Sequence, residues 1–292
     1  MKKLGPFRLS NSAKIIVLLL LAVLVYALFF LGPLLWMFYN SFFRWDPLRL
    51  VDRSVVTMEN YLKVFTHPLY QTGVINSFIV STAATLLSLV FNFPVAYYMT
   101  KLKSQARAIT TMIILTPMMT LSLVTSYAWL TLLTPGGLVN QFLMSIGIIS
   151  EPIIFWGTRI GVILVLVYSF SPHMTLVLNA SLENIDPNYI KAAQILGANR
   201  FQTFYKVILP MSVPGIVAGS ILTFTMCISS FLSPYVMGGR VVKLMAVQVF
   251  DFISVQLNFP LGSAMAIVLL SVVLLMVYVI RSLAEKKFRG GT

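Results

Sequence analysis

Six long stretches without a single Asp, Glu, Lys or Arg limit what this chain can fold into more than any other feature. Each is at or above the length of about 20 residues that a helix needs to cross the hydrocarbon core of a bilayer. The low share of charged residues, 10%, and the mean hydropathy of +0.90 point the same way. We therefore predict an all-α integral membrane protein whose six transmembrane helices occupy residues 15–39, 74–98, 108–132, 160–182, 212–236 and 261–280.

The basic residues predict how these helices are oriented. Six crossings place both termini on one side of the membrane, and Lys and Arg collect in cytoplasmic segments. Of the 21 Lys and Arg residues, 14 fall in one alternating set of segments, namely 1–14, 99–107, 183–211 and 281–292. The other seven fall in the opposite set, 40–73, 133–159 and 237–260. We therefore expect cytoplasmic termini, residues 1–14 and 283–292, around a membrane domain of residues 15–282.

Several kinds of site are missing from the sequence. The net charge of +13 comes without basic blocks interleaved with aromatic residues, which argues against nucleic-acid binding. A single cysteine, Cys227, and two distant histidines offer neither a disulfide nor a metal cluster. The phosphate-binding pattern GxxxxGKS/T and the hydrolase patterns GxSxG and HExxH are absent. We predict no catalytic residue, no metal site and no cofactor in this chain.

The predicted spans also lack the groups that couple transport to an ion gradient. Carriers driven by protons or sodium usually contain charged side chains in the membrane, and no predicted span has one. His173 is the one span residue that titrates near neutral pH, and packing or pore lining suits it better than a proton relay. If the protein moves a solute uphill, we expect another chain to supply the energy.

Small polar residues are concentrated in the second and third spans, where they need partners away from lipid. They are Asn76, Ser77, Ser81, Thr82, Ser88, Asn92, Thr110, Thr111, Thr116, Thr120, Ser122, Thr125 and Ser126. The fifth span opens with Pro214, Gly215 and Gly219, and the small residues permit close helix approach. Packing within the helix bundle and the lining of a translocation path both explain this pattern.

The loop between the fourth and fifth spans, residues 183–211, predicts two short amphipathic helices. Asp186 and Pro187 are typical of a helix start, and Gly197 is typical of a helix end. Asn199 can cap a second helix, whose apolar face would consist of Phe201, Phe204, Tyr205 and Ile208. Such helices either lie at the lipid interface or dock onto a partner.

Two small residues in the first of these helices, Ala192 and Ala193, favour docking because they let a partner approach the backbone. They belong to a longer pattern formed by Lys191, Ala192, Ala193, Gly197, Val207, Leu209 and Pro210. This pattern resembles the motif of binding-protein-dependent ABC importer permeases: EAA, three residues, G, nine residues, I, one residue, then LP. Two positions depart from that motif, since Lys191 stands where the family has glutamate and Val207 where it has isoleucine.

The resemblance implies a type I ABC importer fold in the bacterial inner (plasma) membrane, with multiple spans surrounded by lipid. Loop 183–211 would form the coupling helices for a cytoplasmic ABC ATPase dimer, which would bind ATP and Mg. The other implied partners are a periplasmic solute-binding protein and a second permease subunit, expected to be a similar but distinct chain. The implied ATPase-coupling residues are Lys191, Ala192, Ala193, Gly197, Asn199, Arg200, Phe201, Leu209 and Pro210. Because Lys191 reverses the family's charge, we expect an acidic or neutral ATPase surface opposite it.

Four segments are similar to the spermidine/putrescine permease branch, residues 183–184, 196–220, 234–239 and 258–264. Related branches carry opines, phosphonates, iron or thiamine on the same scaffold. A polyamine suits aromatic faces and acceptor oxygens, so the candidate solute-path residues are Tyr127, Trp129, Tyr168, Tyr235 and Asp251. Anchoring at the membrane boundary is the alternative role for the four aromatic side chains. A secondary carrier and a membrane scaffold that only binds a partner remain as alternatives from other classes.

Overall fold

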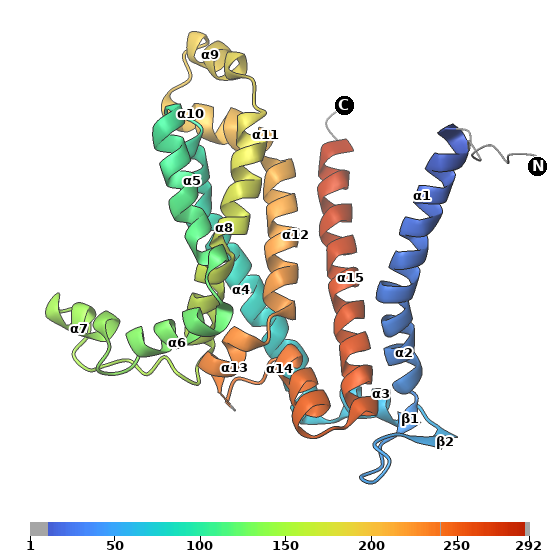
Figure 1. Ribbon diagram of the computed structural model, residues 1–292. Coiled ribbons are helices and arrows are strands. Elements are labelled where there is room, and N and C mark those ends of the chain that lie inside the picture. The colour runs from blue at the N-terminus through green and yellow to red at the C-terminus, as the bar shows by residue number, and fades with distance from the viewer. Residues whose placement is uncertain (1–10, 240, 290–292) are drawn as a thin grey trace, which may run out of the picture.

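The computed structural model describes residues 11–239 and 241–289, and this part of the chain is almost entirely helical (Figure 1). Its elements in chain order are α1 (Asn11–Tyr26), the π-helix η1 (Ala27–Leu31), α2 (Gly32–Asn40), β1 (Phe43–Arg44), β2 (Asp52–Val56), α3 (Glu59–Thr66), α4 (Pro68–Met99), α5 (Ser104–Met119), α6 (Ser122–Leu132), α7 (Leu138–Ser145), α8 (Arg159–Glu183), α9 (Pro187–Ile195), α10 (Arg200–Thr203), the π-helix η2 (Phe204–Ile208), α11 (Leu209–Met211), α12 (Val213–Ser229), α13 (Leu232–Gly238), α14 (Met245–Phe250), the π-helix η3 (Asp251–Val255) and α15 (Phe259–Arg289).

Four of the predicted spans are continuous segments long and apolar enough to cross a membrane, Leu19–Asn40, Pro68–Met99, Arg159–Glu183 and Phe259–Ser282. Two bent pairs add one crossing each if each pair is counted as a single span: α5 with α6, bent by 96°, and Arg200–Met211 with α12, bent by 61°. The described residues therefore hold up to six crossings, as predicted. The fifth is shorter than the predicted 212–236, because α12 ends at Ser229 and α13 is a separate helix.

The third span is not the single helix predicted over residues 108–132. α5 ends at Met119, Thr120 and Leu121 have extended backbone, and α6 then runs in a new direction. Pro117 lies in the last turn of α5 and has no N–H group to donate, which weakens that turn. The chain therefore bends directly after the proline.

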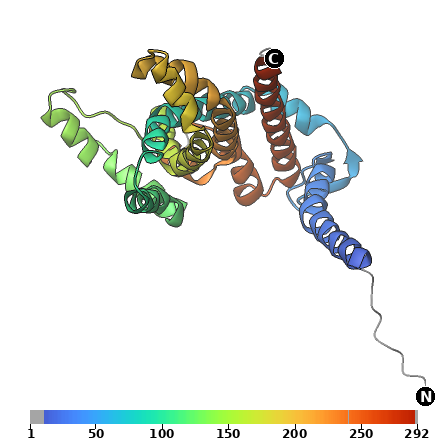
Figure 2. The same cartoon turned by 90° about the horizontal axis from the view of Figure 1, so that it is seen from above.

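The connecting segments gather at two opposite ends of the molecule (Figure 1). One end holds α9, α10, the start of α1 and the end of α15, while the other holds α6, α7, α13, α14 and the β1–β2 hairpin. Seen from above, α1 stands apart on one flank and the green α7 on the other, around a central group of helices (Figure 2). α1 thus begins and α15 ends on the same side of the molecule, as an even number of crossings requires.

The core is formed by α4, α8 and α12, and six polar residues of α4 are buried, namely Asn76, Ser77, Ser81, Thr85, Ser88 and Asn92. Asn92 Nδ2 donates to Ser171 Oγ, and Asn92 Oδ1 accepts from Thr175, both at 2.9 Å. A Cβ added at Gly215 would lie 2.2 Å from Ser181 Cβ, so α12 approaches α8 as the small residue allows. The prediction that second-span polar groups face other helices is confirmed.

By contrast, α5 and the first span lie on the surface of this chain. α5 has no buried residue, and neither does the most apolar part of Leu19–Asn40. The hydroxyls of Thr110, Thr116 and Thr120 donate to carbonyls four residues earlier in their own helix instead of to another helix. Among the polar residues of the third span, only Thr125 and Ser126 are buried.

Candidate functional site

The loop between α8 and α12 is shaped by local hydrogen bonds. Asp186 Oδ1 accepts from the Asn188 amide at 2.8 Å and begins α9. Asn199 and Gln202 form a reciprocal capping box at the start of α10, with bonds of 2.8 and 3.0 Å. Gly197 ends α9 with a φ of +82°, a conformation that L side chains rarely adopt. The predicted helix starts and stop are confirmed.

The second helix of this loop does not keep the single apolar face that its spacing predicts. The π-helical turn η2 follows α10 and shifts later side chains out of the 3.6-residue register. Ile208 is buried and Phe204 packs against the same core cluster. Phe201 and Tyr205 are exposed, with ring centroids 4.5 Å apart. Phe204 therefore faces the core of the protein, whereas Phe201 and Tyr205 face outward.

The nine predicted coupling residues divide in the same way. Seven are exposed, namely Lys191, Ala192, Gly197, Asn199, Arg200, Phe201 and Pro210. Ala193 and Leu209 are half-buried, and Leu209 packs against the core. Sequence reasoning did not single out Ile195 and Leu196, which are 85% and 86% exposed at the end of α9. Large apolar side chains this exposed, beside Phe201 in the same loop, are typical of a surface that contacts another protein.

An ion pair joins the start of this loop to α5. The guanidinium of Arg107 contacts the carboxylate of Glu183, the last residue of α8, and donates to Asn179 Oδ1 at 3.4 Å. Asn179 Nδ2 in turn donates to the Ala96 carbonyl of α4 at 3.3 Å. Side-chain contacts therefore join α4, α5 and α8 where the loop begins.

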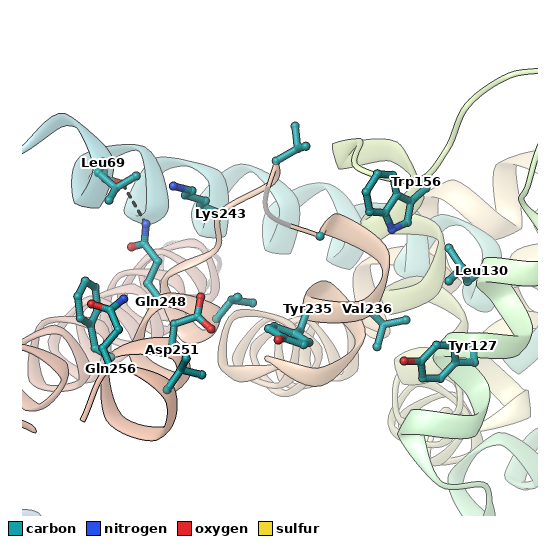
Figure 3. A pocket seen from close by; sticks show the side chains of 15 residues that line it. Leu69, Tyr127, Leu130, Trp156, Tyr235, Val236, Lys243, Gln248, Asp251 and Gln256 are labelled. Carbon is teal, nitrogen blue, oxygen red and sulfur yellow. Dashed lines mark hydrogen bonds between the residues drawn. The ribbon is translucent and has the colours of Figure 1, made fainter. Parts of the chain in front are cut away.

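A cavity of about 730 Å³ lies at the opposite end of the molecule (Figure 3). Helices α6 and α13 form one side of it, and α14, η3 and the start of α4 form the other. Its lining residues are Leu69, Tyr127, Leu130, Trp156, Tyr235, Val236, Gly239, Val241, Lys243, Val247, Gln248, Asp251, Phe252, Val255 and Gln256. This volume is in the usual range for a small-molecule site.

Three of the five predicted solute-path residues meet in this cavity. Tyr127, Tyr235 and Asp251 come from α6, α13 and η3 and line it together (Figure 3). Trp129 and Tyr168 do not line it. Their rings contact edge to face with centroids 5.2 Å apart, and Trp129 packs against the main buried cluster.

Sequence reasoning missed Gln248, which holds one wall of the cavity against α4. Gln248 is 4% exposed and donates from Nε2 to the Leu69 carbonyl at 3.0 Å. Its amide lies against Gly73, where an added Cβ would come 2.4 Å from Oε1. The glycine was the available sequence signal, but a single glycine does not identify the side chain that packs on it.

Two buried residues of α4 hold the next part of the same wall through its backbone. Asn76 Nδ2 donates to the Lys243 carbonyl at 3.2 Å, and Ser77 Oγ accepts from the Met245 amide at 2.8 Å. These bonds occupy polar groups that would otherwise be unsatisfied in the membrane. The wall that carries Lys243 and Asp251 is therefore fixed to the core of the protein.

The cavity offers recognition groups of several kinds. Among its lining residues, Asp251 and Lys243 carry opposite charges, and Tyr127, Tyr235 and Trp156 contribute aromatic faces. Aromatic faces attract cations, and a carboxylate accepts hydrogen bonds from ammonium groups. Within the described residues, no group of three or more His, Cys, Asp or Glu side chains is arranged to hold a metal ion. These groups are suited to binding and passing a solute.

Comparison with known proteins identifies a family and several relatives. Residues 84–290 match the family described as "Binding-protein-dependent transport system inner membrane component". The spermidine/putrescine transport system permease protein PotB of Haemophilus influenzae is 36% identical over 224 residues, which cover 77% of this chain and 78% of that protein. PotB of Escherichia coli is 33% identical over 253 residues, covering 86% and 91% of the two chains.

The same comparison extends to a solved structure. A bacterial ABC transporter involved in the import of the acidic polysaccharide alginate contains a chain that superposes with a TM-score of 0.75. The superposition covers 94% of this chain and 95% of that one, at 17% sequence identity. At this identity the likeness supports a shared fold.

Proposed function

Because the chain belongs to the family of binding-protein-dependent transport system inner membrane components, we propose that it imports a polyamine of the spermidine and putrescine class. As a member of that family it is a multi-pass inner-membrane permease of an ABC importer, a transport subunit without catalytic activity of its own. Its family implies an ATPase and a periplasmic binding protein as partners. The solute, the contact residues and the orientation in the membrane are parts of the proposal.

The lining of the cavity is the observation that supports a polyamine as the solute. Tyr127, Tyr235 and Trp156 provide π faces for alkylammonium groups, and Asp251 provides a carboxylate. Lys243 opposes this charge, so the wall would pass a cation without binding it tightly. The relatives 33 to 36% identical, which are named as spermidine/putrescine permeases, support the same class of solute.

The exposed side of the loop after α8 is the proposed contact with the ATPase. Lys191 and Arg200 supply positive charge there, and Ile195, Leu196 and Phe201 supply apolar contact area. In this arrangement the end that carries α9 is cytoplasmic and the end that carries the cavity faces the periplasm. The charge difference between the two sets of loops supports this orientation.

A second permease subunit, similar to this chain but distinct from it, would complete the pathway. The apolar surfaces of α5 and of the most apolar part of the first span support this proposal, because neither has a residue that the rest of this chain buries. Lipid covers part of such surfaces in any membrane protein, and the partner subunit would cover the part next to α6. The cavity would then lie beside the interface between the two subunits.

Reconstitution tests the proposed function. The chain would be assembled in proteoliposomes with candidate ATPase, second permease and binding-protein subunits, and uptake of labelled spermidine and putrescine measured with and without ATP. We expect uptake that requires ATP and the binding protein. Uptake without ATP would indicate a secondary carrier, and an intact assembly without any uptake would indicate a scaffold.

A screen of the binding protein tests the solute separately. Thermal shifts would be measured with spermidine, putrescine, opines, phosphonates, ferric iron and thiamine. We expect the two polyamines to raise the melting temperature most. A larger shift with any other compound, together with its ATP-dependent uptake, would contradict the polyamine assignment and leave the importer assignment intact.

A further inference from the structure

One residue at the edge of the cavity has a backbone conformation that its side chain does not favour. Leu257 follows η3 and has a φ of +54°, which L residues rarely adopt. The turn is closed by the Gln256 amide, which donates to the Asp251 carbonyl at 2.9 Å, and the Asn258 amide, which donates to the Phe252 carbonyl at 2.7 Å. Glycine is the usual residue at such a helix end. A further interaction with the backbone of Leu257 would therefore stabilise this conformation beyond these two bonds.

That interaction comes from the distant hairpin. Trp45, directly after β1, donates from its indole Nε1 to the Leu257 carbonyl at 3.1 Å, across 212 positions in the sequence. Leu257 is also where the wall helix ends, since Asp251, Phe252 and Val255 belong to η3 and Gln256 follows it, and all four line the cavity. The bond therefore acts on the backbone at the end of one cavity wall.

The hairpin is itself well fixed, so Trp45 is held in place. Asn60 Nδ2 donates to the carbonyls of Ser41 (2.9 Å) and Phe43 (2.8 Å) on the strand that leads to Trp45. Ser54 donates to Asp52 from both its hydroxyl and its amide, and these bonds lower the pKa of the Asp52 carboxyl.

From this geometry we propose that Trp45 is a positioning residue for the cavity: by holding Leu257 in its positive-φ conformation, it sets the position of the η3 wall. The proposal rests on the proposed function, because it treats this cavity as the place where the solute passes. It assigns to the hairpin a role in the solute path, although no hairpin residue lines the cavity. Trp45 acts through Leu257 and does not touch the solute.

The direct test uses cysteine labelling and does not require a solute. Val255→Cys places a thiol on η3 at a position that lines the cavity and is exposed, while the native Cys227 is fully buried. The labelling rate with a membrane-impermeant maleimide would be measured in the full transporter. In Trp45→Phe the ring is kept and the N–H donor is lost, and we expect the rate to change about fivefold, the effect of one net hydrogen bond on an equilibrium.

Two further variants separate positioning from a general loss of structure. Trp36→Phe is the matched control, because Trp36 also lies near the hairpin, with Arg53 over its ring, and its loss of an indole N–H should leave the rate unchanged. Leu257→Gly combined with Trp45→Phe should restore the rate, since glycine adopts positive φ without a steric cost. An unchanged rate in Trp45→Phe, or a change that Leu257→Gly does not reverse, would overturn the proposal.

Uptake measurements with the same variants connect the wall to transport. We expect Trp45→Phe to lower ATP-driven uptake of spermidine and the double variant to recover it, with the same amount of assembled transporter throughout. Unchanged uptake alongside an altered labelling rate would also overturn the role in the solute path. If the unmodified transporter moves no polyamine, the proposed function fails, while the labelling result still decides whether Trp45 positions the wall.

Discussion

Asp251 and Lys243 bring opposite charges to one wall of the cavity, and the two side chains come from different segments of the chain. If a polycation passes this wall, the carboxylate assists it and the ammonium group shortens its stay. On the proposed function, a single charge substitution would shift the preference of the wall for cations without removing the wall, which α4 holds through Gln248, Asn76 and Ser77.

Asp251→Asn should reduce uptake of a polyamine about fivefold, because one partly screened charge interaction contributes about 1 kcal/mol. The measurement is the initial rate of ATP-dependent spermidine uptake in proteoliposomes. Asp46→Asn is the control: Asp46 is another carboxylate at the same end, outside the cavity, and asparagine can keep its hydrogen bonds to the Leu48 and Arg49 amides. Equal rates for both variants would remove Asp251 from the solute path.

Lys191 is the residue at which this chain reverses the charge of the family motif, and it is exposed at the proposed ATPase contact. Lys191→Glu should weaken assembly with the ATPase about fivefold, since an exposed ion pair contributes up to about 1 kcal/mol. Co-purification at low and high salt measures this. Lys206→Glu, in the same loop but at a position that the motif leaves unspecified, should have little effect. Unchanged assembly and transport with Lys191→Glu would count against a specific pairing.

At the scale of single elements, the ion pair between Arg107 and Glu183 connects the loop after α8 to α5. Arg107→Gln should lower the amount of solute moved per ATP hydrolysed, by a factor of about five at most because both side chains are partly exposed. The charge exchange Arg107→Glu with Glu183→Arg should restore coupling. The measurement is uptake and ATP hydrolysis in the same proteoliposomes.

The matched control for this prediction is the ion pair at the opposite end of the molecule, between Arg44 and Glu59 at 3.3 Å. Arg44→Gln removes a similar exposed pair without touching the loop. If it lowers coupling as much as Arg107→Gln does, the link between the loop and α5 has no special part in transport.

Local signals were sufficient for some elements and not for others. The caps at Asp186 and Asn199 and the stop at Gly197 were predicted, because each depends on residues within one turn. Prolines were less informative: Pro94 and Pro172 lie inside the continuous helices α4 and α8, whereas α5 ends soon after Pro117. Whether a proline interrupts a span depends on packing against neighbouring helices, and the sequence does not specify that packing.

The loop and the cavity also differ in how far the sequence could predict them. The two short helices of loop 183–211 could be predicted because their caps and stop are local in sequence, while the contact with an ATPase stays a prediction. The cavity joins α4, α6, α13, α14 and η3, and its volume and wall depend on contacts such as Gln248 with Leu69, 179 residues apart. Hydrophobic periodicity and amino-acid composition contain no information about which residues far apart in the sequence contact each other. Trp129 and Tyr168 were included for their residue type, and they pack against each other outside the cavity.

At the scale of the whole molecule, the two sites lie at opposite ends, so the proposed orientation has a direct test. Leu48, in the hairpin, is 94% exposed at one end, and Leu196 is 86% exposed at the other. In intact cells with a permeable outer membrane, an impermeant maleimide should label Leu48→Cys and spare Leu196→Cys. Permeabilising the inner membrane should expose the second position, and the reverse order would invert the orientation.

The bend of 96° between α5 and α6 lies on the path between the loop and the cavity. Arg107, in the first turn of α5, contacts Glu183 at the start of the loop. At the other end, Tyr127 and Leu130 of α6 line the cavity. If α5 and α6 move as one body, a displacement of α5 at the loop end becomes a sideways displacement of α6 at the cavity. A push on the loop would then widen or narrow the distant cavity without any helix sliding the full depth of the membrane.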